Sequence, residues 1–348
     1  MNVFELTRKL IDIPSVTGAE ANIGYFLAAY LESFGYQVER QAVANERFNV
    51  IATTLDQPRV VLSTHMDTVP PHIRSSEDEE KIYGRGACDA KGIIAAQIFA
   101  AERLRAEGVN EIGLLFTVDE ETGSGGARVA NKQKHRGETD YMINGEPTDN
   151  KLAVATKGSL RFILTTQGRA AHSAYPEQGE SAIEKLLDVL QDLRNVDWPS
   201  DVVLGDTTLN IGVIGGGTRP NVIPDNASAE LQMRLVSNVP DVKHILETAI
   251  ADRARTEYLS ENEPVHLHVV STIGQCVVRF TTDIPYLSNW GTPLLLGPGS
   301  IFNAHTDHEF ILKEELTQAV ELYASLARSL VVESSQVDGA SVSQGVVR

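Results

Sequence analysis

The sequence predicts an α/β protein in which a domain with a mixed, mostly parallel sheet is interrupted by a ferredoxin-like α+β domain. Residues 1–155 alternate strand-like and helix-like segments, which is typical of a sheet with helices on its faces. Residues 158–271 instead follow the order βαββαβ of the ferredoxin-like split unit. Beyond them, a buried strand and a long amphipathic helix resume the first pattern.

The elements of the first domain follow from hydrophobic periodicity. The N-terminal residues have an amphipathic helical pattern, and residues 90–108 repeat apolar side chains at helical spacing up to Gly108, a residue suited to a helix C-cap. Apolar, β-branched runs predict buried strands at 59–67, 111–118 and 139–145. After the insert, the same reasoning predicts a strand at 292–299 and a helix at 313–332.

The insert has its own set of elements. Its strands are expected at 160–168, 207–216, 226–236 and 264–271, and its helices at 179–193 and 241–259. We therefore expect a first domain formed by residues 1–157 and 272–332 and an inserted domain formed by residues 158–271. Residues 333–348 are polar and small without periodicity, so we expect them to be disordered.

Composition excludes several classes of partner. The net charge of −17 over 348 residues argues against nucleic acid or an anionic membrane as the main partner. The longest apolar stretch, residues 92–101, is too short to span a bilayer, and the N-terminus lacks the apolar core of a signal peptide. The only cysteines, Cys88 and Cys276, form no disulfide framework, so a reducing cytoplasm is the expected location.

Three consecutive acids follow the strand at 111–118, namely Asp119, Glu120 and Glu121. Two ionised carboxylates close together disfavour each other's charged form. Such a turn is therefore either solvated by water or occupied by a cation. The choice depends on whether other metal-binding side chains reach the same place.

Other strands of the first domain also end in polar ligands. In an α/β sheet, the crevice outside the carboxyl ends of the strands is where ligands bind. The candidate side chains near these ends are His65, Asp67, Asp89, Glu146 and one of His305 and His308. Carboxylates and imidazoles without cysteine favour zinc, manganese or cobalt in a hydrolytic site, and this set is large enough for two ions.

Seven motifs occur in order between about residues 60 and 310: STHMDTVP, GRGACDAKG, DEETGSGG, NGEPT, GRAAHSAYP, NVIPDNA and AHTDHE. Together they resemble the motifs of the dinuclear zinc amidohydrolases, which include acetylornithine deacetylase, succinyl-diaminopimelate desuccinylase, aminoacylase and glutamate carboxypeptidase. The insert lies where that family carries a lid and dimerisation domain. The resemblance implies a metal-dependent hydrolase of a linear amide bond.

Residue by residue, the resemblance assigns the metal ligands. Asp89 is expected to bridge two zinc ions, with cobalt or manganese as alternatives. His65 and Glu146 would complete the site of one ion, and Glu121 with His305 that of the other.

The same resemblance assigns the catalytic residues around these ligands. Glu120 is expected to be the general base that activates a water between the metals, and Asp67 to orient His65. The Asp89–Ala90 peptide bond is expected to be cis. His308 stands where relatives usually have Asn or Asp, so two histidines compete for one ligand role. The distance from the following glutamate favours His305.

The resemblance also assigns roles in substrate binding and assembly. His172 would stabilise the oxyanion in the active site of a partner subunit, which implies a homodimer formed through the lid. The residues expected to bind the substrate carboxylate, or to lie near it, are Asn221, Arg234, Lys157, Gly297 and Gly299.

The expected substrate is a small N-acyl amino acid, with N-acetylornithine as the best candidate, giving ornithine and acetate. The motifs hold donors for one carboxylate but no clear set for a second. The alternatives are a desuccinylase, a dipeptidase or carboxypeptidase, and a hydrolase that releases lysine or ornithine from a carrier protein.

Two further classes of function compete with this prediction. A dinucleotide-binding module would explain the α/β alternation, but GRGACD has Asp89 where the last glycine of the G-x-G-x-x-G motif should stand. A metal-binding scaffold without activity would need no general base, yet Glu120 is present. A hydrolase explains both features.

Overall fold

The computed structural model describes residues 1–55, 57–134 and 138–343, with residues 336–343 described by their backbone alone. The chain divides into two compact units. One contains Met1–Val154, Leu267–Cys276 and the chain from Thr282 onward, and the other contains Ala155–His266 and Val277–Thr281. The expected insert was residues 158–271, whereas the second unit begins at Ala155, leaves at His266 and also takes in Val277–Thr281, which was expected in the first domain.

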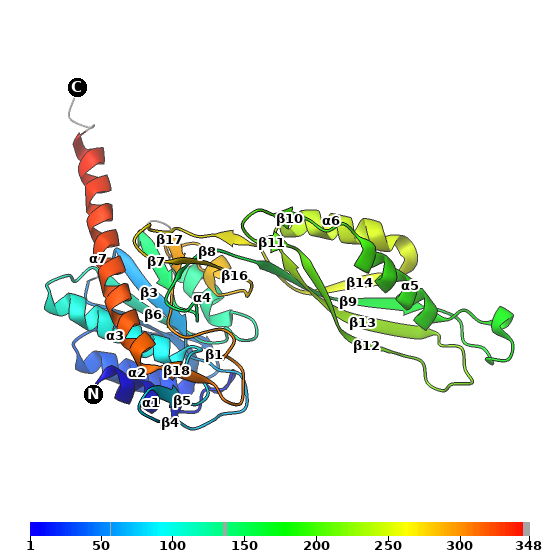
Figure 1. Ribbon diagram of the computed structural model, residues 1–348, viewed down its shortest axis with the longest axis horizontal. Helices are drawn as coiled ribbons and strands as arrows, with labels where there is room; N and C mark the ends of the chain where they lie inside the picture. The colour runs from blue at the N-terminus through cyan, green and yellow to red at the C-terminus, as the bar shows by residue number, and fades with distance from the viewer. Residues whose placement is uncertain (56, 135–137, 344–348) are drawn as a thin grey trace. The chain divides into compact units, whose positions relative to one another are not determined.

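The first unit is built on a six-stranded sheet with the order β1-β2-β6-β3-β7-β17 (Figure 1). Strands β6, β3, β7 and β17 run parallel to one another, and β2 runs antiparallel to both β6 and β1. This confirms the mixed, mostly parallel sheet. The strands are β1 (Gln37–Ala44), β2 (Arg47–Thr53), β3 (Val60–His65), β6 (Ile112–Thr117), β7 (Tyr141–Asn144) and β17 (Thr292–Leu295).

Strands β3 and β6 are buried at every residue, as central parallel strands covered on both faces are. Helix α3 packs on them and also contacts α1 and α7, while α2 and α4 contact β1 and β2. The helices of this unit are α1 (Val3–Ile11), α2 (Ala21–Ser33), α3 (Lys91–Ala106), α4 (Gly125–Gln133), α7 (Lys313–Ser343) and the 3₁₀ turn η3 (Ile284–Tyr286).

Short strands form three small sheets. One has the order β18-β5-β4. Another has the order β15-β8-β16, and the chain passes from one unit to the other within or beside its strands. A third consists of β10 and β11. Their bounds are β4 (Ser76–Glu77), β5 (Lys81–Tyr83), β8 (Leu152–Thr156), β10 (Ser200–Asp201), β11 (Gly205–Asp206), β15 (Val265–His266), β16 (Gln275–Val278) and β18 (Phe310–Leu312).

The second unit has the predicted ferredoxin-like topology. Its antiparallel sheet has the order β12-β13-β9-β14, and α5 and α6 pack on one face of it (Figure 1). Along β13, alternate residues from Ala227 to Leu235 enter a hydrophobic core with both helices. The elements are β9 (Gly158–Gln167), η1 (Pro176–Gln178), α5 (Ala182–Asn195), β12 (Thr208–Gly216), β13 (Asn226–Leu235), α6 (Val239–Ile250), η2 (Ala251–Arg253) and β14 (Arg255–Asn262).

The fourth strand of this unit differs from the sequence prediction. Residues 241–259 were expected to be one helix and residues 264–271 the last strand, but α6 ends at Ile250 and the fourth strand is β14. From Arg255 to Leu259, more and less exposed residues alternate with period two, and Tyr258 packs on Phe162. Pairing with β9 therefore outweighs the helical propensity of this segment.

The C-terminal segment also differs from expectation. Helix α7 continues to Ser343, whereas the polar composition predicts disorder from residue 333. No proline interrupts residues 313–343, so nothing in that sequence forces the helix to stop. Residues 344–348 lie outside the described residues. Within the described chain, no helix is long and apolar enough to cross a bilayer.

The turn after β6 depends on a close approach at Gly126. A β-carbon there would lie 2.4 Å from the Val118 carbonyl oxygen and 2.5 Å from Asn49 Oδ1. Asn49 in turn accepts from Val118 N and donates to the Gly126 carbonyl, so its side chain fastens the end of β6 to the start of α4.

We expect Gly126→Ala to lower the free energy of unfolding by about 1–3 kcal/mol, because backbone atoms must shift to admit the methyl group. Gly274→Ala is the control in the same unit, since a β-carbon there has its nearest neighbour, Lys151 Cγ, at an ordinary contact distance of 3.7 Å. Urea unfolding of both variants measures the difference. Equal stability of Gly126→Ala and the wild type would show that this contact is not tight.

Candidate metal centre

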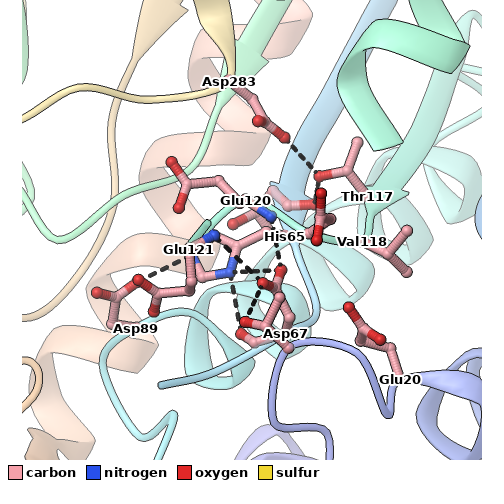
Figure 2. A network of polar contacts seen from close by, with 12 residues as sticks. Glu20, His65, Asp67, Asp89, Thr117, Val118, Glu120, Glu121 and Asp283 are labelled. Carbon is pink, nitrogen blue, oxygen red and sulfur yellow. Dashed lines mark hydrogen bonds and ion pairs between the residues drawn. The ribbon is translucent and has the colours of Figure 1, made fainter. Parts of the chain in front are cut away.

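Three neighbouring parallel strands deliver side chains to one edge of the sheet. His65 is the last residue of β3, Glu121 follows β6, and Glu146 follows β7. Asp89 lies just before α3, and His305 follows β17. One ligand atom each of His65, Asp89 and Glu121 lie within 4.8 Å of one another. Figure 2 shows these three residues in one cluster with Asp67 and Glu120.

Asp89 faces both histidines with different oxygens. Its Oδ1 lies 2.9 Å from His65 Nε2, and its Oδ2 lies 3.3 Å from His305 Nε2. His305 Nε2 also lies 3.1 Å from Glu121 Oε1. The carboxylate of Asp89 therefore stands between two groups of ligands, as a bridging ligand must. Its peptide bond to Ala90 is cis, as the resemblance implies.

The ring of His65 is oriented by its other nitrogen. Nδ1 donates to the backbone carbonyl of Asp67 at 3.0 Å, because a carbonyl oxygen can only accept. This leaves Nε2, which faces Asp89, as the nitrogen with a lone pair for a metal. The carboxylate of Asp67 is farther from Nδ1, at 3.5 Å, so the backbone of Asp67 holds the ring more directly than its side chain does.

The buried carboxylate of Asp67 instead fixes the acidic turn. Its two oxygens accept from the backbone N–H groups of Glu120 at 3.1 Å and Glu121 at 3.2 Å (Figure 2). Its Oδ2 also accepts from Thr17 Oγ1 at 2.8 Å. Burial would raise the pKa of Asp67, but hydrogen bonds from His65, Thr17 and Glu120 N–H keep that pKa below its usual value. The charged carboxylate is therefore the stable form.

The field of the carboxylates acts on both histidines. Burial would lower the pKa of His65, yet its contacts with Asp67 and Asp89 hold that pKa well above the usual value. Contacts with Asp89 and Glu121 raise the pKa of His305 to about 10. The negative charge around both imidazoles therefore favours a positive charge at their positions.

Glu120 and Glu146 respond in the opposite direction. Burial raises the pKa of both carboxyl groups well above the usual range, and the charge of Glu146 adds to the effect on Glu120. Oε1 of Glu146 is buried and forms no hydrogen bond in the described part of the chain. An orphaned carboxylate oxygen beside imidazoles and other carboxylates fits the oxygen and nitrogen ligand set of divalent transition metals. The residues present therefore fit a divalent metal site.

Two glycines that were predicted to lie near the substrate make close contacts beside this cluster. A β-carbon at Gly297 would lie 2.3 Å from the backbone oxygen of Glu146, and one at Gly299 would lie 2.6 Å from Cys88 Cβ. Both glycines therefore allow the chain to approach residues at or beside the metal ligands. His308 is exposed, whereas His305 has the contacts with Asp89 and Glu121.

Two polar groups escaped the sequence analysis. Asp283 is buried and accepts from Thr117 Oγ1 at 2.7 Å, and burial raises its pKa to about 6 (Figure 2). Arg47 Nη1 lies 3.2 Å from both Glu20 and Asp119, which joins the acidic turn to the start of α2. Nothing in the sequence near these residues indicates their partners, which lie far away along the chain.

The remaining predicted residues belong to the second unit. His172 is exposed, and its segment pairs with the one that carries Asn221, since Ser173 N donates to the Asn221 carbonyl at 3.0 Å. Lys157 is buried and its ammonium group donates to the Asp206 carbonyl. Arg234 is half-buried on β13, and burial lowers the pKa of its guanidinium.

Comparison with known sequences supports the metal centre. The profile of peptidase family M20/M25/M40 matches residues 61–329. A peptidase M20 domain-containing protein of Schizosaccharomyces pombe is 38% identical over 92% of this chain and 83% of its own length. A protein of Aspergillus clavatus named as a probable carboxypeptidase is 36% identical over 92% of this chain and 81% of its own length.

Solved structures share the fold. The aminopeptidase PepT from Bacillus cereus aligns with a TM-score of 0.76 at 22% identity, covering 95% of this chain and 98% of its own. A dinuclear metal-binding peptidase of the M20 family from Bacillus subtilis aligns with a TM-score of 0.68 at 18% identity, covering 95% and 97%. The protein is therefore a metal-dependent hydrolase that belongs to peptidase family M20/M25/M40.

Proposed function

We propose that the protein uses two divalent metal ions, best zinc, to hydrolyse the amide bond that joins a small acyl group to an amino acid with a free α-carboxylate. The observation that supports this most directly is Asp89, whose two oxygens face His65 and His305 separately. Glu146 would join His65 at one ion and Glu121 would join His305 at the other. When bound, divalent ions lower the pKa of a water molecule and polarise the carbonyl group of the amide.

Glu120 is the proposed general base. Its backbone is held by Asp67, so its position relative to the neighbouring ligand Glu121 is fixed. Burial and the charge of Glu146 raise the pKa of its carboxyl group. A carboxylate held beside the proposed ligands can take a proton from water and later give it to the amine that leaves.

Arg234 is the proposed anchor for the α-carboxylate. It lies on the face of the insert's sheet that the helices leave open, together with Arg161 of β9. Arg161 forms an ion pair with Glu230, whereas no described residue gives Arg234 an acidic partner. A half-buried guanidinium without such a partner suits a bidentate substrate carboxylate. Lys157 and Asn221 are proposed as additional donors.

N-Acetylornithine is our first candidate substrate, because the motifs offer donors for one carboxylate and the protein's acidic balance tolerates a cationic side chain. The second candidate is a peptide substrate, cleaved by a carboxypeptidase or dipeptidase activity, since the similar protein of Aspergillus clavatus is named as a probable carboxypeptidase. Both reactions release an amino acid with a free α-carboxylate. They differ only in the acyl group.

We further propose that the insert forms a homodimer along β12. This strand is at the edge of the sheet, and its Val213 and Ile214 are 61% and 52% exposed. An edge strand with exposed apolar side chains is a template for pairing with another chain. A second copy of β12 would extend the sheet, and His172 would then be available to the partner's metal centre.

Glu120→Gln should retain both metal ions but lower kcat by at least about 100-fold, the effect of losing a general base. Glu121→Gln is the matched control on the adjacent residue, and it should lower the metal content. Metal analysis and steady-state kinetics of the two variants separate the roles. Near wild-type turnover of Glu120→Gln would remove it from catalysis.

The substrate assignment is tested by kcat/KM with zinc or cobalt bound. We expect N-acetylornithine to exceed N-succinyl-diaminopimelate and simple dipeptides by at least about ten-fold, which is about 1.4 kcal/mol of transition-state discrimination. Arg234→Met should lower kcat/KM for every substrate that carries the α-carboxylate. A dipeptide preferred ten-fold would favour the carboxypeptidase instead.

Catalysis across subunits is tested by mixing two inactive variants. Hybrids of His172→Ala and Glu120→Gln subunits should regain part of the wild-type activity, because one site of each hybrid would have both side chains intact. Light scattering should show a dimer, and labelled subunits must be seen to exchange. Exchange without any recovery of activity would mean that His172 does not act on the partner's site.

A further inference from the structure

The five proposed metal ligands are not held equally by the sheet. His65, Glu121 and Glu146 are at or just beyond the ends of β3, β6 and β7, whose parallel pairing fixes their spacing. Asp89 and His305 lie in connecting segments that are far apart in the sequence. Their separation therefore needs another constraint.

We propose that the buried carboxylate of Glu309 is a positioning residue that fixes Asp89 relative to His305, an inference that rests on the proposed two-metal centre. Its Oε1 accepts from three backbone N–H groups of the segment before α3: those of Gly86 at 3.0 Å, Cys88 at 3.1 Å and Asp89 at 3.2 Å. The bridging residue is thus fixed through its own backbone.

The second oxygen of Glu309 connects the same segment to His305. Oε2 accepts from Arg85 Nη1 at 2.8 Å, and Arg85 Nη1 also donates to the carbonyl of Thr306, next to His305, at 3.0 Å. Both side chains are buried, with each residue 1% exposed. Arg85 and Glu309 therefore form one rigid link between the two segments that the sheet does not hold.

A carboxylate is needed at this position because both of its oxygens face donors. The amide of glutamine would point its NH₂ group either at the backbone N–H groups or at Arg85, which places donor against donor. A buried donor without an acceptor is costly, so the segments would move apart. The expected consequence is a displaced Asp89 and weaker metal binding.

The test is a zinc titration of metal-free Glu309→Gln in competition with a chelator, together with its thermal unfolding. We expect the affinity for at least one of the two ions to fall by about 10–100-fold, the effect of losing a group that orients a ligand. Glu315→Gln is the matched control, because Glu315 caps the backbone of Leu312 nearby and contacts neither metal-bearing segment. It should bind both ions as the wild type does.

Glu309→Asp serves if Glu309→Gln does not fold, since it keeps the charge beside Arg85 but shortens the reach to the backbone. A folded variant that is less stable, yet binds both ions with wild-type affinity, would reduce Glu309 to a purely structural role and overturn the proposal. Failure of both variants to fold even with zinc would overturn it too. A wild type that bound no metal would instead refute the proposed function.

Discussion

Buried charge of one sign is the constraint on which the arrangement of this protein depends. Six carboxyl groups come together around two imidazoles at the carboxyl edge of the parallel sheet: Asp67, Asp89, Glu120, Glu121, Glu146 and Asp283. Ionised carboxylates this close disfavour each other unless donors or cations compensate them. The two imidazoles lie against these carboxylates, whose contacts raise the pKa of both His65 and His305.

The acids of this region divide into two kinds by their partners. Asp67, Asp119 and Glu309 each accept backbone N–H groups, and by doing so they fix the turn and the segment that bear other acids. Asp89 and Glu121 direct oxygens at histidines instead, and Glu146 leaves an oxygen without a partner. The first kind positions the backbone of the site, and the second kind supplies the oxygens that we propose as ligands of divalent ions.

The sequence predicts the second kind better than the first. Recognisable buried strands end at or just before His65, Glu121 and Glu146. Because parallel strands bring their carboxyl ends to one edge of the sheet, the sequence alone predicts that these three side chains lie close together. The hydrogen-bond partners of Glu309 and Asp283 are distant along the chain. Neither hydrophobic periodicity nor motif spacing predicts such contacts. The missed strand β14 has a similar cause, because its pairing with β9 is decided by the sheet and not by the segment itself.

The two units divide the proposed hydrolytic chemistry from the proposed binding of the substrate carboxylate. All the proposed metal ligands belong to the first unit, at strand ends and in segments fixed by buried carboxylates. The proposed carboxylate anchor Arg234 belongs to the second unit, where pairing of β13 with β9 and β12 fixes its position. Because no described acid of that unit pairs with Arg234, its guanidinium can be replaced without disturbing an ion pair, and the metal centre stays intact. Loss of this guanidinium should therefore weaken the binding of every substrate with an α-carboxylate, while the first unit retains the hydrolytic chemistry.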